Sequence, residues 1–189
     1  MADFLISYGK MQPKERGWAD NPADRGGETW NGIARKKHPR WGGWHLIDEV
    51  RYQPGFPEIL GQIAELRDAE REFYREEFWR PILGEQLPQA IADELFEASV
   101  NCGTGNGVRF LQIALNLLNR NNALYRDVEV DGRMGHDTLG AVQSCLVARG
   151  EPRLLQFMNQ SQGNYYWDLM LRDPTQEEFA LGWYDRTRT

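Results

Sequence analysis

Residues 15–33 read ERGWADNPADRGGETWNGI, and the organisation of the whole chain follows from this stretch. Its prolines and glycines disfavour a long helix and are typical of loops with a short hairpin. The wider segment 13–57 continues the pattern, with five of the nine prolines and four of the seven tryptophans. Aromatic loops on a rigid scaffold often form binding surfaces; the alternative is that Trp18, Trp30, Trp41 and Trp44 form a compact small core.

Outside this segment, apolar residues recur at helical spacing. The charged run 67–72 reads as an exposed helix face, and the glycine-rich stretch 103–107 as a turn between helices. The pattern predicts a mainly α class, with helices over residues 2–12, 57–79, 88–103, 108–119, 137–149 and 152–171, and a last one capped by Asp173 that runs through Trp183.

Composition excludes several classes of protein. The 189 residues, 41% apolar and 26% charged, suit one generous globular domain or one with a small appendage. Two cysteines exclude a disulfide scaffold, and Cys102 and Cys145 read as small buried hydrophobes. The net charge of −6 argues against nucleic acid as a partner. No apolar run suits a membrane span and the first residues do not resemble a signal peptide, so we expect folding in a cytoplasm.

A local basic cluster, Arg35, Lys36, Lys37 and Arg40, stands against this acidic background. It is either a solvated loop or a cationic patch that meets an anionic ligand.

Elimination leaves carboxylates as the candidate catalytic groups. The three histidines lack zinc-ligand spacing, no serine-hydrolase elbow is present, and Cys102 sits at a helix end. Glu15 follows the first helix, Asp24 lies nine residues further on, and Thr29 comes next. Hydrolysis of a glycosidic bond needs one protonated carboxyl and a second, ionised group, which these residues can supply.

Residues 15–33 resemble the signature of glycoside hydrolase family 108, approximately E-G-G-Y-x-N-D-P-x-D-x-G-G-x-T-N-x-G-I. The family comprises lysozyme-like N-acetylmuramidases of phages, prophages and bacteria. The resemblance continues at 74–79 and 98–103. Residues 111–112 and 130–138 are similar to the family's predicted peptidoglycan-binding region, and 182–186 to its closing G-W-x-x-R. Arg16 departs from the pattern, since a glycine usually follows the acid.

The resemblance implies a lysozyme-like helical domain with a small β-hairpin beside the active-site cleft. Residues 1–100 would form the catalytic region, and 101–189 a helical C-terminal region packed with it as one globular unit. Glu15 would be the general acid, Asp24 the second carboxylate and Thr29 a water-positioning hydroxyl. The substrate-binding residues would be Trp18, Gly26, Gly27, Trp30, Asn31 and Asn101.

The function implied is a peptidoglycan hydrolase that cuts the β-1,4 bond from N-acetylmuramic acid to N-acetylglucosamine. We expect a monomeric phage or prophage endolysin that needs no metal or cofactor, acts on glycan strands, and stays in the host cytoplasm until release. The alternative is a non-catalytic cell-wall binding or secretion-associated protein that retains the fold, which Arg16 favours. A peptidase or amidase of the same polymer is disfavoured by the missing zinc and Cys-His signatures.

Overall fold

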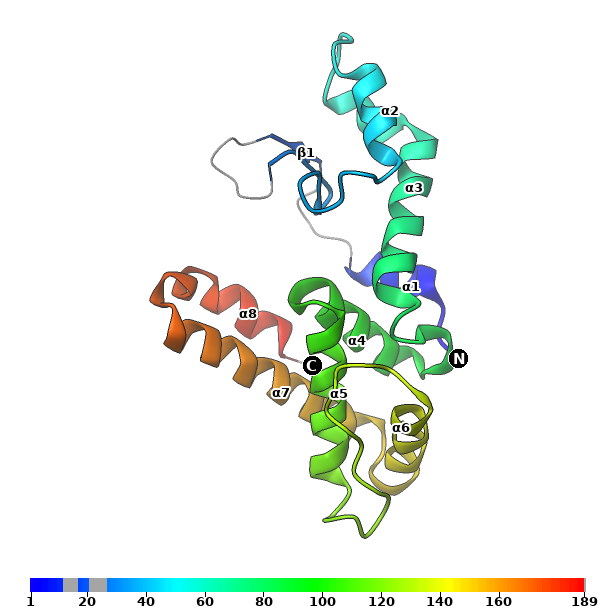
Figure 1. Ribbon diagram of the computed structural model, residues 1–189, viewed down its shortest axis with the longest axis vertical. Coiled ribbons are helices and arrows are strands. Elements are labelled where there is room, and N and C mark those ends of the chain that lie inside the picture. The colour runs from blue at the N-terminus through cyan, green and yellow to red at the C-terminus, as the bar shows by residue number, and fades with distance from the viewer. Residues whose placement is uncertain (12–16, 21–26, 189) are drawn as a thin grey trace. The chain divides into compact units, whose positions relative to one another are not determined.

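A computed structural model of the chain, which describes residues 1–11, 17–20 and 27–188, is mainly helical with one small antiparallel sheet (Figure 1). The predicted mainly α class with a small hairpin is therefore confirmed. The chain divides into two compact units. We call Met1–Met11 with Phe78–Thr189 the helical unit, and Gln12–Glu77 the sheet unit. Within the described residues, no helix is long and apolar enough to cross a membrane.

The helices of the helical unit begin and end close to the predicted positions. Gly103 (φ 86°) and Gly150 (φ 83°) adopt the left-handed region and separate successive helices. The elements are α1 (Phe4–Met11), η3 (Gly84–Gln86), α4 (Gln89–Cys102), α5 (Thr104–Leu118), α6 (His136–Arg149), α7 (Glu151–Arg172), η4 (Pro174–Phe179) and α8 (Ala180–Arg186).

An apolar core holds these helices together, and α5 packs against both α4 and α7. Leu95, Phe96, Leu111 and Leu154 are fully buried. Burying one such side chain contributes about 1.5–3 kcal/mol relative to leaving it exposed. The ring of Phe96 lies 5.9 Å from that of Phe4 and 5.7 Å from that of Trp79, both edge-on.

Helix α1 belongs to this core because it packs on α4. Ser7 Oγ donates to Asp93 Oδ1 at 2.5 Å, and Lys10 Nζ forms an ion pair with Asp93 Oδ2. The boundaries of the two compact units thus differ from the predicted boundary at residue 100. The predicted boundary separates a catalytic region from a C-terminal region by function, and it stays a prediction.

Two predicted details of the helical unit were wrong. The stretch 103–107 is not a turn throughout, since α5 already begins at Thr104. Gly107 allows close helix packing, because a Cβ there would lie 2.7 Å from Ser99 Oγ. The last helix starts as a 3-10 helix and becomes α-helical only at Ala180, although Asp173 caps it as expected by accepting from Thr175 N–H at 3.1 Å.

The two cysteines are free thiols of the helical unit. Cys145 is fully buried as predicted, whereas Cys102 is half-buried and its Sγ lies 3.4 Å from Tyr166 Oη. Burial raises the pKa of both thiols, which makes them poor nucleophiles.

The described residues of the sheet unit form three two-residue strands in the order β1-β2-β3, all antiparallel. They are β1 (Trp18–Ala19), β2 (Thr29–Trp30) and β3 (Ile33–Ala34). Trp18 pairs with Trp30, and Thr29 with Ala34. Strands this short are not stable alone and depend on what packs against them.

The remaining elements of the sheet unit are helical: α2 (Gly43–Val50), η1 (Glu58–Gln62), α3 (Ala64–Tyr74) and the start of η2 (Arg75–Trp79), a π-helical segment that continues into the helical unit. Helix α2 corrects the prediction that segment 13–57 consists of loops with a short hairpin. The predicted helix over 57–79 is interrupted at Ile63, which is extended (φ −76°, ψ 109°).

Candidate active site

Part of the predicted catalytic constellation lies outside the described residues. This applies to Glu15 and Asp24, to Gly26, and to Arg16, so their roles stay predictions. The described residues next to them, which begin again at Gly17 and Gly27, show how the chain is held at these two points.

Asn31 fixes the chain at Gly17, two residues after Glu15 in sequence. Gly17 N–H donates to Asn31 Oδ1 at 2.7 Å, and Asn31 N–H donates to Gly17 O at 3.0 Å. Asn31 is 8% exposed and has a positive φ of 44°, a conformation that asparagine tolerates better than most residues. Tyr74 Oη donates to Asn31 O at 2.8 Å, which ties this turn to α3.

A buried carboxylate, Glu70 of α3, anchors the same turn. Its Oε2 accepts from Asn31 Nδ2 at 2.7 Å and from Trp30 Nε1 at 3.1 Å. Glu70 is only 3% exposed, so the charged run 67–72 is not exposed throughout as predicted. It lies four residues from Leu66 and from Tyr74, which places all three on the buried face of α3.

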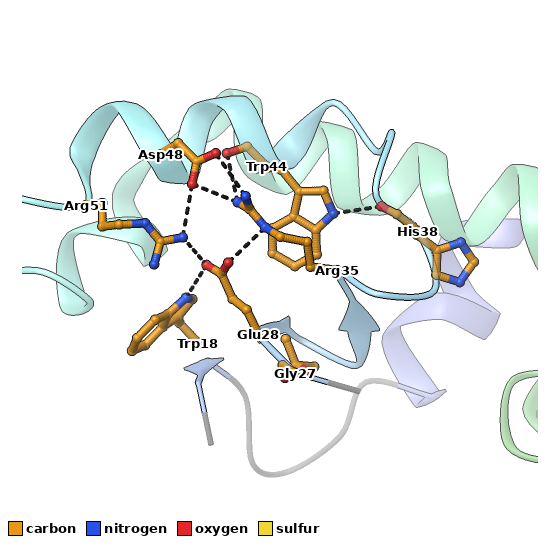
Figure 2. A network of polar contacts seen from close by, with 9 residues as sticks. Trp18, Gly27, Glu28, Arg35, His38, Trp44, Asp48 and Arg51 are labelled. Atoms are coloured by element: carbon orange, nitrogen blue, oxygen red, sulfur yellow. Dashed lines mark hydrogen bonds and ion pairs between the residues drawn. The ribbon is translucent and has the colours of Figure 1, made fainter. Parts of the chain in front are cut away.

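A second carboxylate, Glu28, organises a network of polar contacts between the sheet and α2 (Figure 2). Its Oε1 accepts from Trp18 Nε1 at 2.8 Å and from Arg51, while Oε2 pairs with Arg35 Nε at 2.8 Å. The Glu28 side chain is 10% exposed. Arg35 therefore belongs to the interior of this network rather than to a freely solvated basic loop.

Asp48 of α2 completes this network by joining Arg35 and Arg51. It accepts from Arg35 at 2.7 and 3.0 Å and from Arg51 at 3.0 Å. The hydrogen bond from Arg35, together with that from Arg51 and both positive charges, lowers the pKa of Asp48 despite some desolvation. The network thus links the sheet to α2 through alternating charges.

Thr29 and Gly27 lie where the chain enters β2. Thr29 Oγ1 donates to Gly27 O at 3.1 Å, which leaves its oxygen able to accept a hydrogen bond. Gly27 has a φ of 66°, and a Cβ there would lie 2.9 Å from Lys36 Cε. The positive φ therefore favours glycine here, whereas the exposed Lys36 side chain could shift to admit a Cβ.

The structure brings five of the predicted site residues together on the small sheet and its turns: Trp18, Gly27, Thr29, Trp30 and Asn31. Trp18 is partly exposed, with its ring 4.8 Å from that of Phe56. Trp30 is 5% exposed, so its indole contributes mainly to packing. Their contacts with substrate stay predictions.

Asn101 belongs to the helical unit, where its Nδ2 donates to Glu97 O at 2.9 Å and Glu97 Oε1 at 2.7 Å.

Sequence reasoning missed Glu28, Glu70 and Arg51. The available signal was the spacing of Glu70 from the apolar residues of α3. Nothing local in the sequence pairs Glu28 with Arg51.

The helical unit contains a second group of acidic residues, beside a cavity of about 300 Å³ between α1, α4 and α7. Burial raises the pKa of Glu94 to about 7, and Glu97 and Asp93 add to this effect, while a hydrogen bond from Asn159 opposes it. The pKa of Asp93 is lowered, because hydrogen bonds from Lys10, Ser7 and Gln89 outweigh its desolvation. Among the described residues, no group of three or more His, Cys, Asp or Glu is arranged to hold a metal ion.

Comparisons with known proteins give matches to two family models that together cover most of the chain. Residues 9–103 match the family described as Glycosyl hydrolase 108, and residues 106–188 match one described as "Predicted Peptidoglycan domain". A search of curated proteins gave no match. A solved structure, "Structure of Brucella abortus SagA", is similar in fold with a TM-score of 0.61 and 20% identity, over 97% of this chain and 88% of that one. The chain therefore belongs to the glycosyl hydrolase 108 family, and it is a glycoside hydrolase that acts on peptidoglycan.

Proposed function

We propose that the chain is an N-acetylmuramidase, which cuts the β-1,4 bond from N-acetylmuramic acid to N-acetylglucosamine with Glu15 as general acid. The observation that supports this best is the double hydrogen bond between Asn31 and Gly17. A general acid has to be held in place relative to the leaving oxygen. The chain next to Glu15 is attached at Gly17 to a buried network, as this role requires.

In the proposed reaction, Glu15 protonates the glycosidic oxygen as the bond breaks. Asp24 is ionised and activates a water molecule. Thr29 helps to orient that water: its hydroxyl proton is donated to Gly27 O, so its oxygen can accept a hydrogen from the water. A separation of about 6.5–9.5 Å between the two carboxyl groups would accommodate this water and lead to inversion, the outcome that we favour, whereas about 5–5.5 Å would lead to retention.

The bond specificity is tested by mass spectrometry of the fragments released from purified peptidoglycan. A muramidase yields products with muramic acid at the reducing end. Products with reducing-end N-acetylglucosamine would contradict the proposed bond, and free stem peptides would indicate an amidase.

Substitution of the general acid tests the mechanism and the alternative of a non-catalytic wall-binding protein. Glu15→Gln keeps size and hydrogen-bonding capacity but has no proton to donate, so activity should fall about 100-fold or more. Glu49→Gln, which changes a half-exposed carboxylate of α2, is the matched control. Activity of Glu15→Gln at the wild-type level would refute the assignment. Absence of activity in the wild type would favour the non-catalytic alternative.

We also propose that the protein is a monomeric endolysin, kept in the host cytoplasm until it is released. Expression in bacteria should leave cells intact until the membrane is permeabilised, after which they lyse. Lysis without permeabilisation would contradict this localisation, and sedimentation velocity tests the monomer.

A further inference from the structure

The sheet unit has an open groove of about 760 Å³ that the catalytic proposal does not use. One side is the loop 36–42, and the other is formed by α3 and the beginning of η2. The groove lies entirely within one compact unit.

The loop side of the groove is cationic. Lys36, Lys37 and Arg40 line it and are exposed. The fourth member of the basic cluster, Arg35, is bound to Glu28 and Asp48 instead. The cluster therefore has two parts, of which one stabilises the sheet and the other faces a solvent-filled groove.

The helix side of the same groove is acidic, with Glu72, Glu76 and Glu77. These residues follow one another along the helical segment, so the groove presents positive charge on one side and negative charge on the other. A ligand that matches both sides must itself carry groups of both signs.

Aromatic side chains also line the groove, in fixed positions. The rings of His38 and Phe73 lie 4.7 Å apart, edge to face, and Trp41 is 6.2 Å from Phe73. Trp41 Nε1 donates to Ala69 O at 3.2 Å, which attaches the loop to α3. These contacts hold the two charged sides in a defined arrangement and add apolar surface for a ligand.

We propose that this groove binds the stem peptide of peptidoglycan. The proposal rests on the function of the chain as a peptidoglycan hydrolase. The N-acetylated sugars of the glycan strand carry no charge when their lactyl groups bear peptides. They therefore have no charged group to pair with the three basic and three acidic side chains of the groove. The stem peptide carries free carboxylates and, on its third residue, a side-chain ammonium. It thus has groups of both signs, separated by a short peptide backbone.

The first experiment compares two soluble ligands, N-acetylglucosaminyl-N-acetylmuramyl tetrapeptide and the same disaccharide without its peptide. Titration calorimetry at low salt should show binding of the wild type to the tetrapeptide ligand and much weaker binding to the disaccharide. The variant Lys36→Gln/Lys37→Gln/Arg40→Gln should weaken tetrapeptide binding about tenfold, the sum of three exposed charge contacts. The loss should be smaller at 0.3 M salt, because salt screens exposed charges.

A matched variant controls for net charge. Lys10→Gln/Arg67→Gln/Arg71→Gln removes three exposed basic side chains that do not line the groove and lie outside residues 106–188, and it should leave binding of the tetrapeptide ligand unchanged. Thermal unfolding of both variants verifies that they are folded.

The acidic side is tested by acetylating the side-chain ammonium of the ligand. Acetylation should weaken binding to the wild type, but not to Glu72→Gln/Glu76→Gln/Glu77→Gln, which has already lost the partner charges. Equal effects in both proteins would overturn the assignment of the acidic side.

Three outcomes would overturn the proposal: no binding of the tetrapeptide ligand, equal binding of the peptide-free disaccharide, or equal losses in the cationic-side variant and its control. Cleavage of peptide-free glycan strands is measured separately. Failure of the wild type to cleave any glycan would refute the proposed muramidase activity. The binding experiment would still show whether the groove binds the stem peptide.

Discussion

The helical unit buries rings and aliphatic side chains between its helices, whereas the sheet unit places carboxylates at the junctions of its elements. Phe96, fully buried between Phe4 and Trp79, represents the first kind of contact. Glu70, 3% exposed and bonded to Trp30 and Asn31, represents the second. Apolar contacts depend on area and volume, while hydrogen bonds also depend on direction.

This difference shows what each unit needs from its interior. Long helices satisfy their own backbone groups and need mainly a core against which to pack. Strands of two residues satisfy few backbone groups, so side-chain acceptors must fix where each turn lies. Hydrogen bonds of defined direction therefore occur at Gly17 and Gly27, the described residues that are close in sequence to the predicted catalytic residues Glu15 and Asp24.

The largest expected effect is the loss of apolar packing in the helical unit. Phe96→Ala removes a fully buried ring and should lower the free energy of unfolding by about 3–5 kcal/mol, because a cavity remains. Hydrogen exchange should accelerate in α4 and α5 more than in α2 and α3. Val147→Ala, at a 91% exposed position, is the control and should have almost no effect. Equal acceleration of exchange in both units would show that they unfold together, and would contradict the view that each unit is stabilised by its own kind of contact.

Removal of the buried carboxylate should affect the sheet unit almost as strongly. Glu70→Ala leaves Trp30 Nε1 and Asn31 Nδ2 without their acceptor, at a cost of about 2–4 kcal/mol. Exchange should accelerate at Gly17 and Asn31. Glu70→Gln should lose less, because its amide oxygen can still accept, and Glu65→Gln on the exposed face of α3 should change little. Unchanged exchange at Gly17 after Glu70→Ala would break the link between Glu70 and the predicted catalytic segment.

Glu94 sharpens the comparison, because it is a carboxylate largely buried in the helical unit, with a pKa raised from its usual 4.5 to about 7. Below pH 4.5 it is protonated in both the folded and the unfolded chain. Between pH 4.5 and 7 the unfolded chain releases this proton and the folded chain keeps it, so rising pH favours unfolding. The stability contributed by the raised pKa, up to about 3 kcal/mol, is lost across this range and stays lost above pH 7.

Glu94→Gln should remove this part of the pH dependence, as measured by urea unfolding from pH 4 to 8. Glu151→Gln, in the first turn of α7, is the matched control, and the wild-type pH dependence should remain in it. An unchanged slope in Glu94→Gln would show that another group titrates in this range.

The smallest effect is expected at the exposed edge of the Glu28 network. Asp48 has a side chain that is 45% exposed, so Asp48→Asn should cost less than about 1 kcal/mol despite its two arginine partners. Its lowered pKa means that this contribution is present above the ordinary pKa of aspartate and fades as the pH falls below it. A loss as large as that of Glu70→Ala, measured by the same unfolding experiment, would mean that the network acts as one buried unit.

Much of the helical fold was predictable because its boundaries are local signals. Pro88 and Gly103 bracket α4, and Gly150 separates α6 from α7. Helix α2 was not predicted, since Pro39 and Gly42 precede it, Gly43 is its first residue, and these residue types disfavour a helix on local grounds. It forms because Trp44 and Ile47 on one of its faces are buried in the sheet unit, which only the tertiary structure reveals.

The site was predictable in its residue types and not in its partners. The signature at 15–33 led to Thr29, Gly27 and Asn31, which do lie together. The role of Glu70 depends on an acceptor placed opposite two donors that are about forty residues away in sequence. Similarly, Trp30 was predicted to contact sugar because it is aromatic, but burial of its indole against Glu70 depends on long-range packing.

The helical unit is built from two separate segments of the chain, and this affects the order in which contacts can form during synthesis. Helix α1 is made first, yet Ser7 bonds to Asp93, 86 residues later. At ordinary elongation rates of roughly 5–20 residues per second, α1 emerges from the ribosome about 4–17 s before this partner. All of Gln12–Glu77 is made in this interval. The polar network of the sheet unit can therefore form before Phe96, the packing partner of Phe4, has been synthesised.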